Sequence, residues 1–114
     1  MGQYVEVMTY NGKEIVYLNM DGLDEAEQLK AIDECDKVFS SKSNILNVTN
    51  VANTVTTNTV TTKANDLNNK HRLNIKAQAV VGVSGMKRII AQGMNRKMYF
   101  AKSLEDAKEW LVKQ

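Results

Sequence analysis

The residues best suited to chemistry lie in one stretch, residues 77–90, where a short apolar run ends at a glycine. Ser84 and Gly85 follow, and then helical spacing begins, so this stretch predicts a buried strand that leads into the first turn of a helix. Free backbone N–H groups in such a turn bind anions, and Lys87 and Arg88 add positive charge beside them. We therefore expect a ligand- or partner-binding site here, although Ser84 is first of all a helix N-cap.

A catalytic group is missing from this stretch. Residues 82–86 come close to the Gly-x-Ser-x-Gly nucleophile elbow, but Met86 occupies the position of the last glycine. In that hydrolase fold the histidine follows the serine, whereas His71, the single histidine, precedes it. We expect His71 at the surface or at a helix end, and Cys35 as a small buried apolar residue. With no metal-ligand spacing around either of them, we expect no enzymatic activity, no cofactor and no metal site.

Length and composition indicate one globular domain over residues 1–114. The chain is 43% hydrophobic and 25% charged, as is usual for soluble proteins. It has no apolar run near the ~20 residues needed to cross a bilayer, so it is not expected to be transmembrane. A single cysteine and the lack of a visible secretory signal fit a cytoplasmic protein.

Charge is distributed unevenly along the chain. Residues 1–62 hold four lysines and nine acidic residues, whereas residues 63–102 hold nine basic residues and one acidic residue. The basic half could meet phosphate groups, or it could simply form solvated helix faces. The aromatic residues do not alternate with basic ones as in a base-stacking surface, so we expect no nucleic-acid partner.

Sequence patterns in the first half of the chain predict a hairpin, a helix and a strand. Asn11-Gly12 suits a two-residue turn between two β-prone runs. Asp24 can cap a helix whose apolar residues recur at helical spacing up to Phe39, and a strand is expected over 45–51.

Residues 53–71 are ambiguous. Their threonines favour a strand, but Val60, Ala64, Leu67 and His71 recur at helical spacing. We predict a helix that Asn53 could cap, and the alternative is an extra hairpin in residues 54–62.

The second half predicts strands over 75–83 and 98–101, each followed by a helix. An apolar stripe beginning at Met86 either covers the sheet or lines an adaptable apolar pocket. Ser103 caps the last helix. The alternation predicts an α/β fold in which an N-terminal β-hairpin joins a mostly parallel sheet of about five strands, covered by about four helices.

Three features together resemble small bacterial proteins of the SpoIIAA-like group within the STAS fold (sulfate transporter and anti-sigma-factor antagonist). They are the order of elements, the helix start from Gly82 to Gly85, and the closing segment from Ser103 to Leu111. The resemblance implies a single STAS-like domain that regulates or binds another protein without catalysis. It also implies distant similarity to CRAL-TRIO lipid-binding domains.

Antagonists of this group are switched by phosphorylation of a serine in an Asp-Ser-x-Gly motif at a helix start. Residues 49–55 occupy the corresponding region here and lack the motif, so Thr54 is the nearest hydroxyl by placement alone. We expect a protein partner, with a homodimer as a further option through exposed edge strands. The alternative is a carrier or sensor of a small apolar, lipid-like or anionic ligand. The predicted binding residues are Asn50, Asn53, Thr54, Ser84, Gly85, Lys87 and Arg88.

Overall fold

The computed structural model describes residues 3–55, 57–83 and 98–114. The described elements, in chain order, are β1 (Val5–Tyr10), β2 (Lys13–Asn19), α1 (Glu25–Ser40), β3 (Ile45–Asn50), α2 (Asn58–Lys70), β4 (Ile75–Val81), β5 (Tyr99–Ala101) and α4 (Leu104–Leu111).

The strands form one sheet in the order β1-β2-β3-β4-β5. β1 and β2 are antiparallel, and every other neighbouring pair is parallel. The hairpin turn has Asn11 at φ 50° and Gly12 at φ 78°, which is the backbone that a two-residue turn of this kind requires. The predicted α/β fold is therefore confirmed, with strand ends within two residues of those expected.

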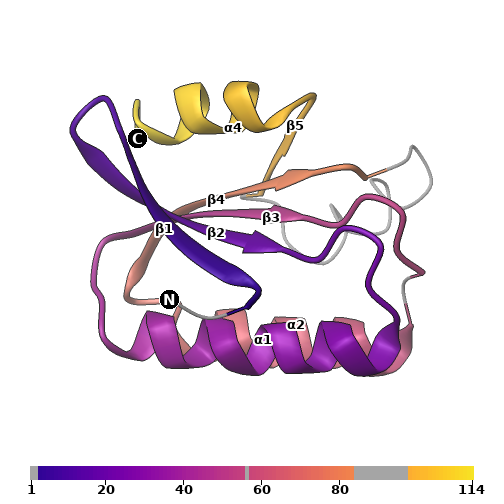
Figure 1. The fold of residues 1–114 in the computed structure, drawn as a ribbon. Coiled ribbons are helices and arrows are strands. Elements are labelled where there is room, and N and C mark those ends of the chain that lie inside the picture. Colours follow the sequence, from indigo (N-terminus) through magenta and orange to yellow (C-terminus); the bar gives the residue numbers. More distant parts are fainter. Residues whose placement is uncertain (1–2, 56, 84–97) are drawn as a thin grey trace.

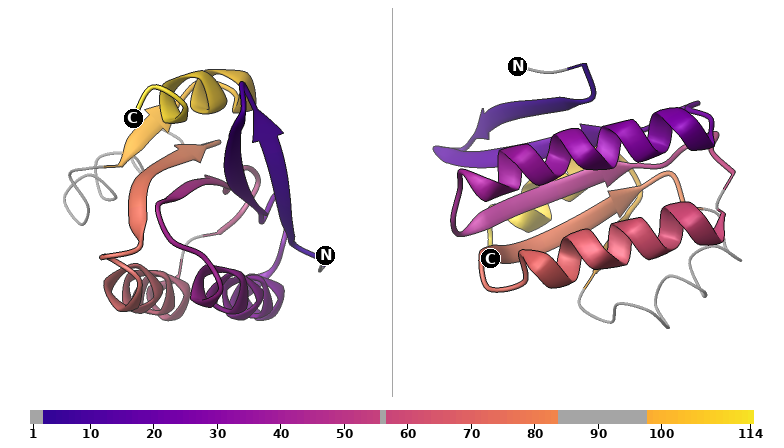
Figure 2. Two further views of the ribbon diagram at one scale, coloured as in Figure 1. Left: turned by 90° about the vertical axis from the view of Figure 1, so that its left-hand side faces the viewer. Right: turned by 90° about the horizontal axis from the view of Figure 1, so that it is seen from below.

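Helices cover both faces of the sheet. α1 and α2 lie side by side under one face, and α4 lies on the other face (Figures 1 and 2). Among the described residues there are three helices, and the predicted helix that begins after Ser84 lies outside that part of the chain. None of the helices in the described ranges is long and apolar enough to cross a membrane.

Two apolar clusters hold the layers together. One joins α1 and α2 to the sheet and contains the fully buried Cys35 and Phe39, so the predicted burial of Cys35 is confirmed. The other lies beneath α4 and contains Ile15 and Leu111. Burial of such side chains contributes roughly 1.5–3 kcal/mol each to folding, which makes these two clusters the main source of stability.

A buried polar network also fixes α2 on the sheet. Asn47 is 3% exposed in the middle of β3, and its Nδ2 donates to the carbonyl oxygen of Val16 at 3.0 Å. Gln78 Nε2 donates to Oδ1 of Asn47 at 3.3 Å and to Oδ1 of Asn68 on α2 at 2.9 Å. Buried polar groups are tolerated when they are hydrogen-bonded. Because these hydrogen bonds need Asn68 at one place, they favour one position of α2 on the sheet.

A side chain caps the first turn of each of the three described helices. Asp24 accepts from the backbone N–H of Glu27 at 2.9 Å, and Ser103 accepts from that of Asp106 at 3.1 Å, as predicted. The cap of α2 is Thr57, which accepts from the N–H of Val60 at 3.2 Å. The prediction that Asn53 caps this helix is therefore wrong, and so is the alternative hairpin.

Candidate functional site

Residues that follow three strands meet at the carboxyl end of the parallel strands, on the right-hand side of Figure 1. They follow β2 (20–24), β3 (51–55 and 57) and β4 (82–83), and we call these described residues the loop rim. Backbone hydrogen bonds of 2.9–3.0 Å join each loop to the next: Met20 N to Asn50 O, Gly22 N to Ala52 O, and Val51 N to Val81 O. Ligands of open α/β sheets usually bind at this end, and here the loops form one connected surface.

Gly82 lets two of these loops approach closely. Its φ is +88°, and a Cβ placed there would lie 2.6 Å from the backbone N of Ala52. Only glycine fits this backbone conformation and this spacing without displacing its neighbour. The sequence identified Gly82 as the end of a strand, but not as the point where β4 touches the loop after β3.

Two of the predicted site residues, Asn50 and Asn53, connect the rim. Asn50 donates from Nδ2 to the Tyr17 hydroxyl at 3.2 Å. Its Oδ1 accepts from the N–H of Ala52 at 3.0 Å. Asn53 has φ 56°, a conformation that asparagine tolerates better than most residues, and its Nδ2 donates to Oδ1 of Asp21 at 2.9 Å. Both amides therefore position the rim, and the exposed Asn53 also presents polar atoms to solvent.

Thr54 lies beneath the rim surface. It is 8% exposed, and its hydroxyl donates to the carbonyl oxygen of Val51 at 2.5 Å. Because α2 begins only at Asn58, Thr54 does not stand at a helix start, and that part of the prediction is wrong. A sequence alone does not reveal that the threonine turns inward while its neighbour turns outward.

That neighbour, Val55, was not among the predicted site residues. Its side chain is 76% exposed, although the backbone beneath it is fixed. The carbonyl oxygen of Val55 accepts from Nε2 of Gln28 at 3.3 Å, and Gln28 on α1 is itself 2% exposed. The apolar side chain of Val55 is therefore exposed to solvent on a loop whose backbone is fixed by a hydrogen bond from α1.

The remaining predicted site residues lie outside the described parts of the chain. These are Ser84, Gly85, Lys87 and Arg88. An anion site in the turn after Gly82 stays a prediction, as does a pocket beside the apolar stripe from Met86. The structure therefore brings together Asn50, Asn53 and Thr54 of the predicted set.

His71 stands at the end of α2, which confirms one of the two predicted positions, but it is buried and not at the surface. It caps the end of α2 and is 5% exposed. Its Nε2 lies 2.6 Å from Oδ1 of Asp36, and its ring packs edge-on against Phe39, with 5.6 Å between ring centres. The hydrogen bond from His71, with a further contribution from Lys70, holds the pKa of Asp36 below its ordinary value. The pair joins α1 to α2.

Other groups near this pair show little sign of reactivity. Burial raises the pKa of the Cys35 thiol to about 12, so thiolate, the reactive form, is scarce at neutral pH. Within the described ranges, no three His, Cys, Asp or Glu residues gather as metal ligands. The His71–Asp36 pair therefore serves as a helix-to-helix contact.

The hollows of the described part of the molecule include two shallow ones that lie apart from the loop rim. One, of about 200 Å³, lies at the amino end of the parallel strands, and Lys13, Lys42 and Lys76 contribute to its wall. The other, of about 180 Å³, is a groove between α1 and α2. Both are smaller than the roughly 300–1,000 Å³ of drug-sized ligand pockets.

Comparison with known proteins supports the fold. No family model matches the chain, and no curated protein matches it. A crystal structure of an uncharacterized protein of the DUF3478 family from Shewanella loihica PV-4, described as having a SpoIIAA-like fold, superposes with a TM-score of 0.71. The alignment covers 94% of this chain and 91% of the other, at 13% identity. The chain has a SpoIIAA-like fold. At this identity the SpoIIAA-like match establishes the architecture and leaves the activity to be argued from the site.

Proposed function

We propose that this SpoIIAA-like domain is a non-enzymatic regulatory module that binds a protein partner through the loop rim. One observation carries the proposal: Val55 is 76% exposed on a loop whose backbone is held by a buried glutamine. An exposed apolar side chain gains free energy when a partner covers it. A supported loop loses little conformational entropy on binding, which favours recognition.

Polar groups around Val55 fit the same role. Asn53 and Asp21 lie on the rim, are exposed and are hydrogen-bonded to each other. Protein interfaces commonly surround a small apolar contact with a polar, hydrogen-bonding margin. Ser84, Gly85, Lys87 and Arg88 remain proposed contributors from the turn that follows Gly82, and a cytoplasmic location belongs to the same proposal.

Phosphorylation of Thr54 is part of the proposed regulation. The hydroxyl is buried and bonded to Val51, so a kinase could reach it only when the loop opens. A phosphate adds about −1.5 to −2 charges at pH 7 and could not return to that position without losing its hydration. Modification would therefore keep the loop open and displace Val55 from its binding position.

The test compares two exposed apolar residues at opposite ends of the molecule. Wild-type protein, Val55→Asp and Leu73→Asp serve as bait in quantitative affinity capture from lysate. We expect a partner that is retained by wild type and Leu73→Asp and lost with Val55→Asp, because Leu73, 92% exposed, lies away from the rim. The captured protein is then purified and its binding to the same three variants is measured by calorimetry. Equal binding to all three would refute the proposal.

The alternative role, as a carrier or sensor of a small apolar or anionic molecule, is tested on the same preparation. Native mass spectrometry of freshly purified protein should give the mass of the bare chain. A stoichiometric bound lipid or metabolite would replace the proposed function with the carrier role.

A further inference from the structure

Basic side chains gather at the amino end of the parallel strands, opposite the loop rim. We call this surface the cationic end, and the left panel of Figure 2 looks onto it. It carries the hairpin turn, the turns that end α1 and α2, and the start of β4. Its basic residues are Lys13, Lys37, Lys42, Lys70, Arg72 and Lys76.

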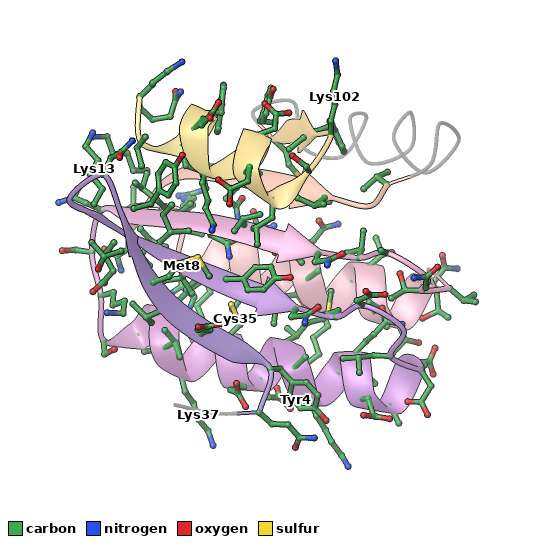
Figure 3. The ribbon with its side chains drawn as sticks, turned by 45° about the horizontal axis from the view of Figure 1, so that its top comes forward. Tyr4, Met8, Lys13, Cys35, Lys37 and Lys102 are labelled. Atoms are coloured by element: carbon green, nitrogen blue, oxygen red, sulfur yellow. The ribbon has the colours of Figure 1, made fainter. Side chains whose placement is uncertain are left out.

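Contacts place these residues together. Lys13, Lys42 and Lys76 line one hollow, and Lys70 lies 3.1 Å from Asp36, which is next to Lys37 in α1. Lys13 stands at the tip of the hairpin, and Lys37 projects from α1 away from the sheet (Figure 3).

Nearby carboxylates offset only part of this charge. Lys42 pairs with Glu14 at 2.6 Å, Lys70 pairs with Asp36, and Asp66 lines the same groove as Lys70. Lys13 donates to a neutral group, the carbonyl oxygen of Val112, at 2.7 Å. The cationic end therefore keeps about three positive charges, since Glu109 and Lys113 at the end of α4 offset each other.

Helix dipoles explain only part of the pattern. Lys37 and Lys70 stand in the last turns of α1 and α2, where cations are favoured. Lys13 and Lys76 belong to strands, and Arg72 lies in the turn beyond α2. Lys13 donates to the C-cap carbonyl of α4, and Arg72 directly follows the C-cap of α2, so helix ends favour these two residues as well. Lys76 has no such contact with a helix end.

An apolar residue stands among these charges. Leu73 is 92% exposed in the turn between α2 and β4, next to Arg72. That turn is fixed to the sheet, because Ile45 donates its N–H to the carbonyl oxygen of Asn74 at 2.7 Å. The fold thus presents a leucine at a fixed place within a basic surface.

We propose that the cationic end docks on a membrane surface rich in anionic phospholipid headgroups, with Leu73 entering the boundary of the acyl chains. Basic residues near such a surface each add to binding, and an inserted apolar side chain adds a second contribution. A nucleic acid fits less well, because its phosphates offer nothing to a leucine. Nor does the described surface expose any large aromatic side chain on which bases could stack. Docking in this orientation leaves the loop rim facing away from the membrane.

Vesicle co-sedimentation of the full chain tests the proposal. Binding to phosphatidylcholine vesicles that contain about 30% phosphatidylserine should exceed binding to pure phosphatidylcholine by at least about tenfold. It should weaken strongly between about 0.05 M and about 0.5 M salt, because salt screens exposed charges.

Matched charge reversals locate the binding surface. Arg72→Glu/Lys76→Glu should lower binding to the anionic vesicles by at least about tenfold. The control Lys30→Glu/Lys102→Glu changes the net charge equally but lies elsewhere: Lys30 is on α1 away from its last turn, and Figure 3 shows Lys102 before α4. All four side chains are exposed, and none has a salt bridge within the described structure, although Lys102 lies near Asp106. Folding of both variants is therefore checked by circular dichroism before binding is compared. Equal losses in both variants would overturn the proposal.

Leu73→Ser tests insertion separately from charge. Serine removes an apolar side chain that the folded protein does not bury, so the unfolding midpoint should stay the same while vesicle binding falls several-fold. Unchanged binding would overturn the role of Leu73, and absence of binding to anionic vesicles would overturn the whole proposal. Binding to duplex DNA or RNA in place of vesicles would also overturn it and assign the surface to nucleic acid.

Discussion

Asp36 joins two helices through a single side chain. Its Oδ1 lies 2.6 Å from His71 Nε2, and its Oδ2 lies 3.1 Å from Lys70 Nζ. A carboxylate can only accept, so Nε2 of His71 carries the shared proton when Asp36 is ionised. Replacing the carboxylate by a neutral amide would leave the buried imidazole with a weaker acceptor, because hydrogen bonds to a charged group are stronger than those between neutral groups.

Asp36→Asn should lower the free energy of unfolding by about 1–2 kcal/mol at neutral pH. The pKa of Asp36 is lowered in the folded protein, chiefly by the hydrogen bond from His71. The ionised Asp36 therefore contributes its full stabilisation at any pH above 3.8, the ordinary pKa of the carboxyl group. The stabilisation is lost as the pH falls through the lower pKa that Asp36 has in the folded protein. Urea unfolding of wild type and Asp36→Asn is measured over a pH series. The difference between their free energies of unfolding should narrow as the pH falls below 3.8.

Asp33→Asn is the matched control for this prediction. Asp33 lies one turn earlier on α1 and pairs with Lys63 of α2 at 2.7 Å, but its side chain is 62% exposed. Exposed pairs contribute at most about 1 kcal/mol, so the control should change stability little at any pH. A larger loss for Asp33→Asn than for Asp36→Asn would contradict the role assigned to the His71 contact.

At the scale of helices and strands, sequence patterns that depend only on neighbouring residues gave correct predictions. The Asn11-Gly12 turn and the Asp24 and Ser103 caps were predicted because each needs only its own neighbours in the chain. The prediction that Asn53 caps α2 was wrong, because groups from the loop after β2 and from α1 hold the loop after β3, and no local sequence pattern reveals them. The partner of Asn53 is Asp21, far away in the sequence.

The start of α2 gives a direct test at this scale. Thr57→Ala should lower the free energy of unfolding by about 1 kcal/mol, because it removes the acceptor for the N–H of Val60. Thr59→Ala, an exposed position in the same first turn, should be neutral or slightly stabilising, since alanine favours helix. Chemical denaturation compares the two variants. Equal losses would mean that Thr57 is not the cap.

The candidate site could be predicted only in part, because contacts between segments that are distant in the sequence decide which side chains are exposed. Strand ends and loop positions placed Asn50, Asn53 and Thr54 at the carboxyl end of the sheet, as the element order implies. Which side chains face outward depends on packing between elements: Thr54 turns inward, and Val55 is exposed because Gln28 holds its carbonyl group. The burial of His71 follows likewise from contacts between α1 and α2.

At the scale of the whole molecule, the sheet divides the interior into two apolar clusters. Each cluster includes side chains from the central strand β3: Ile45 faces the α1 and α2 layer, and Leu46 and Val48 face α4. Because successive residues of a strand point to opposite faces, loss of one cluster would expose the strand that supports the other. The two layers should therefore unfold together, as expected of one domain over residues 1–114.

The chain contains one reporter for each layer. Cys35, the single cysteine, is 1% exposed on the buried face of α1. Trp110, the single tryptophan, stacks on Tyr99 with 4.7 Å between ring centres in the α4 layer. In a urea titration, thiol labelling of Cys35 and fluorescence of Trp110 should give the same midpoint, because cooperative unfolding makes different probes coincide. Circular dichroism provides a third curve for the helices. A Trp110 transition at clearly lower urea would show that the α4 layer separates first and that the chain is not one cooperative unit.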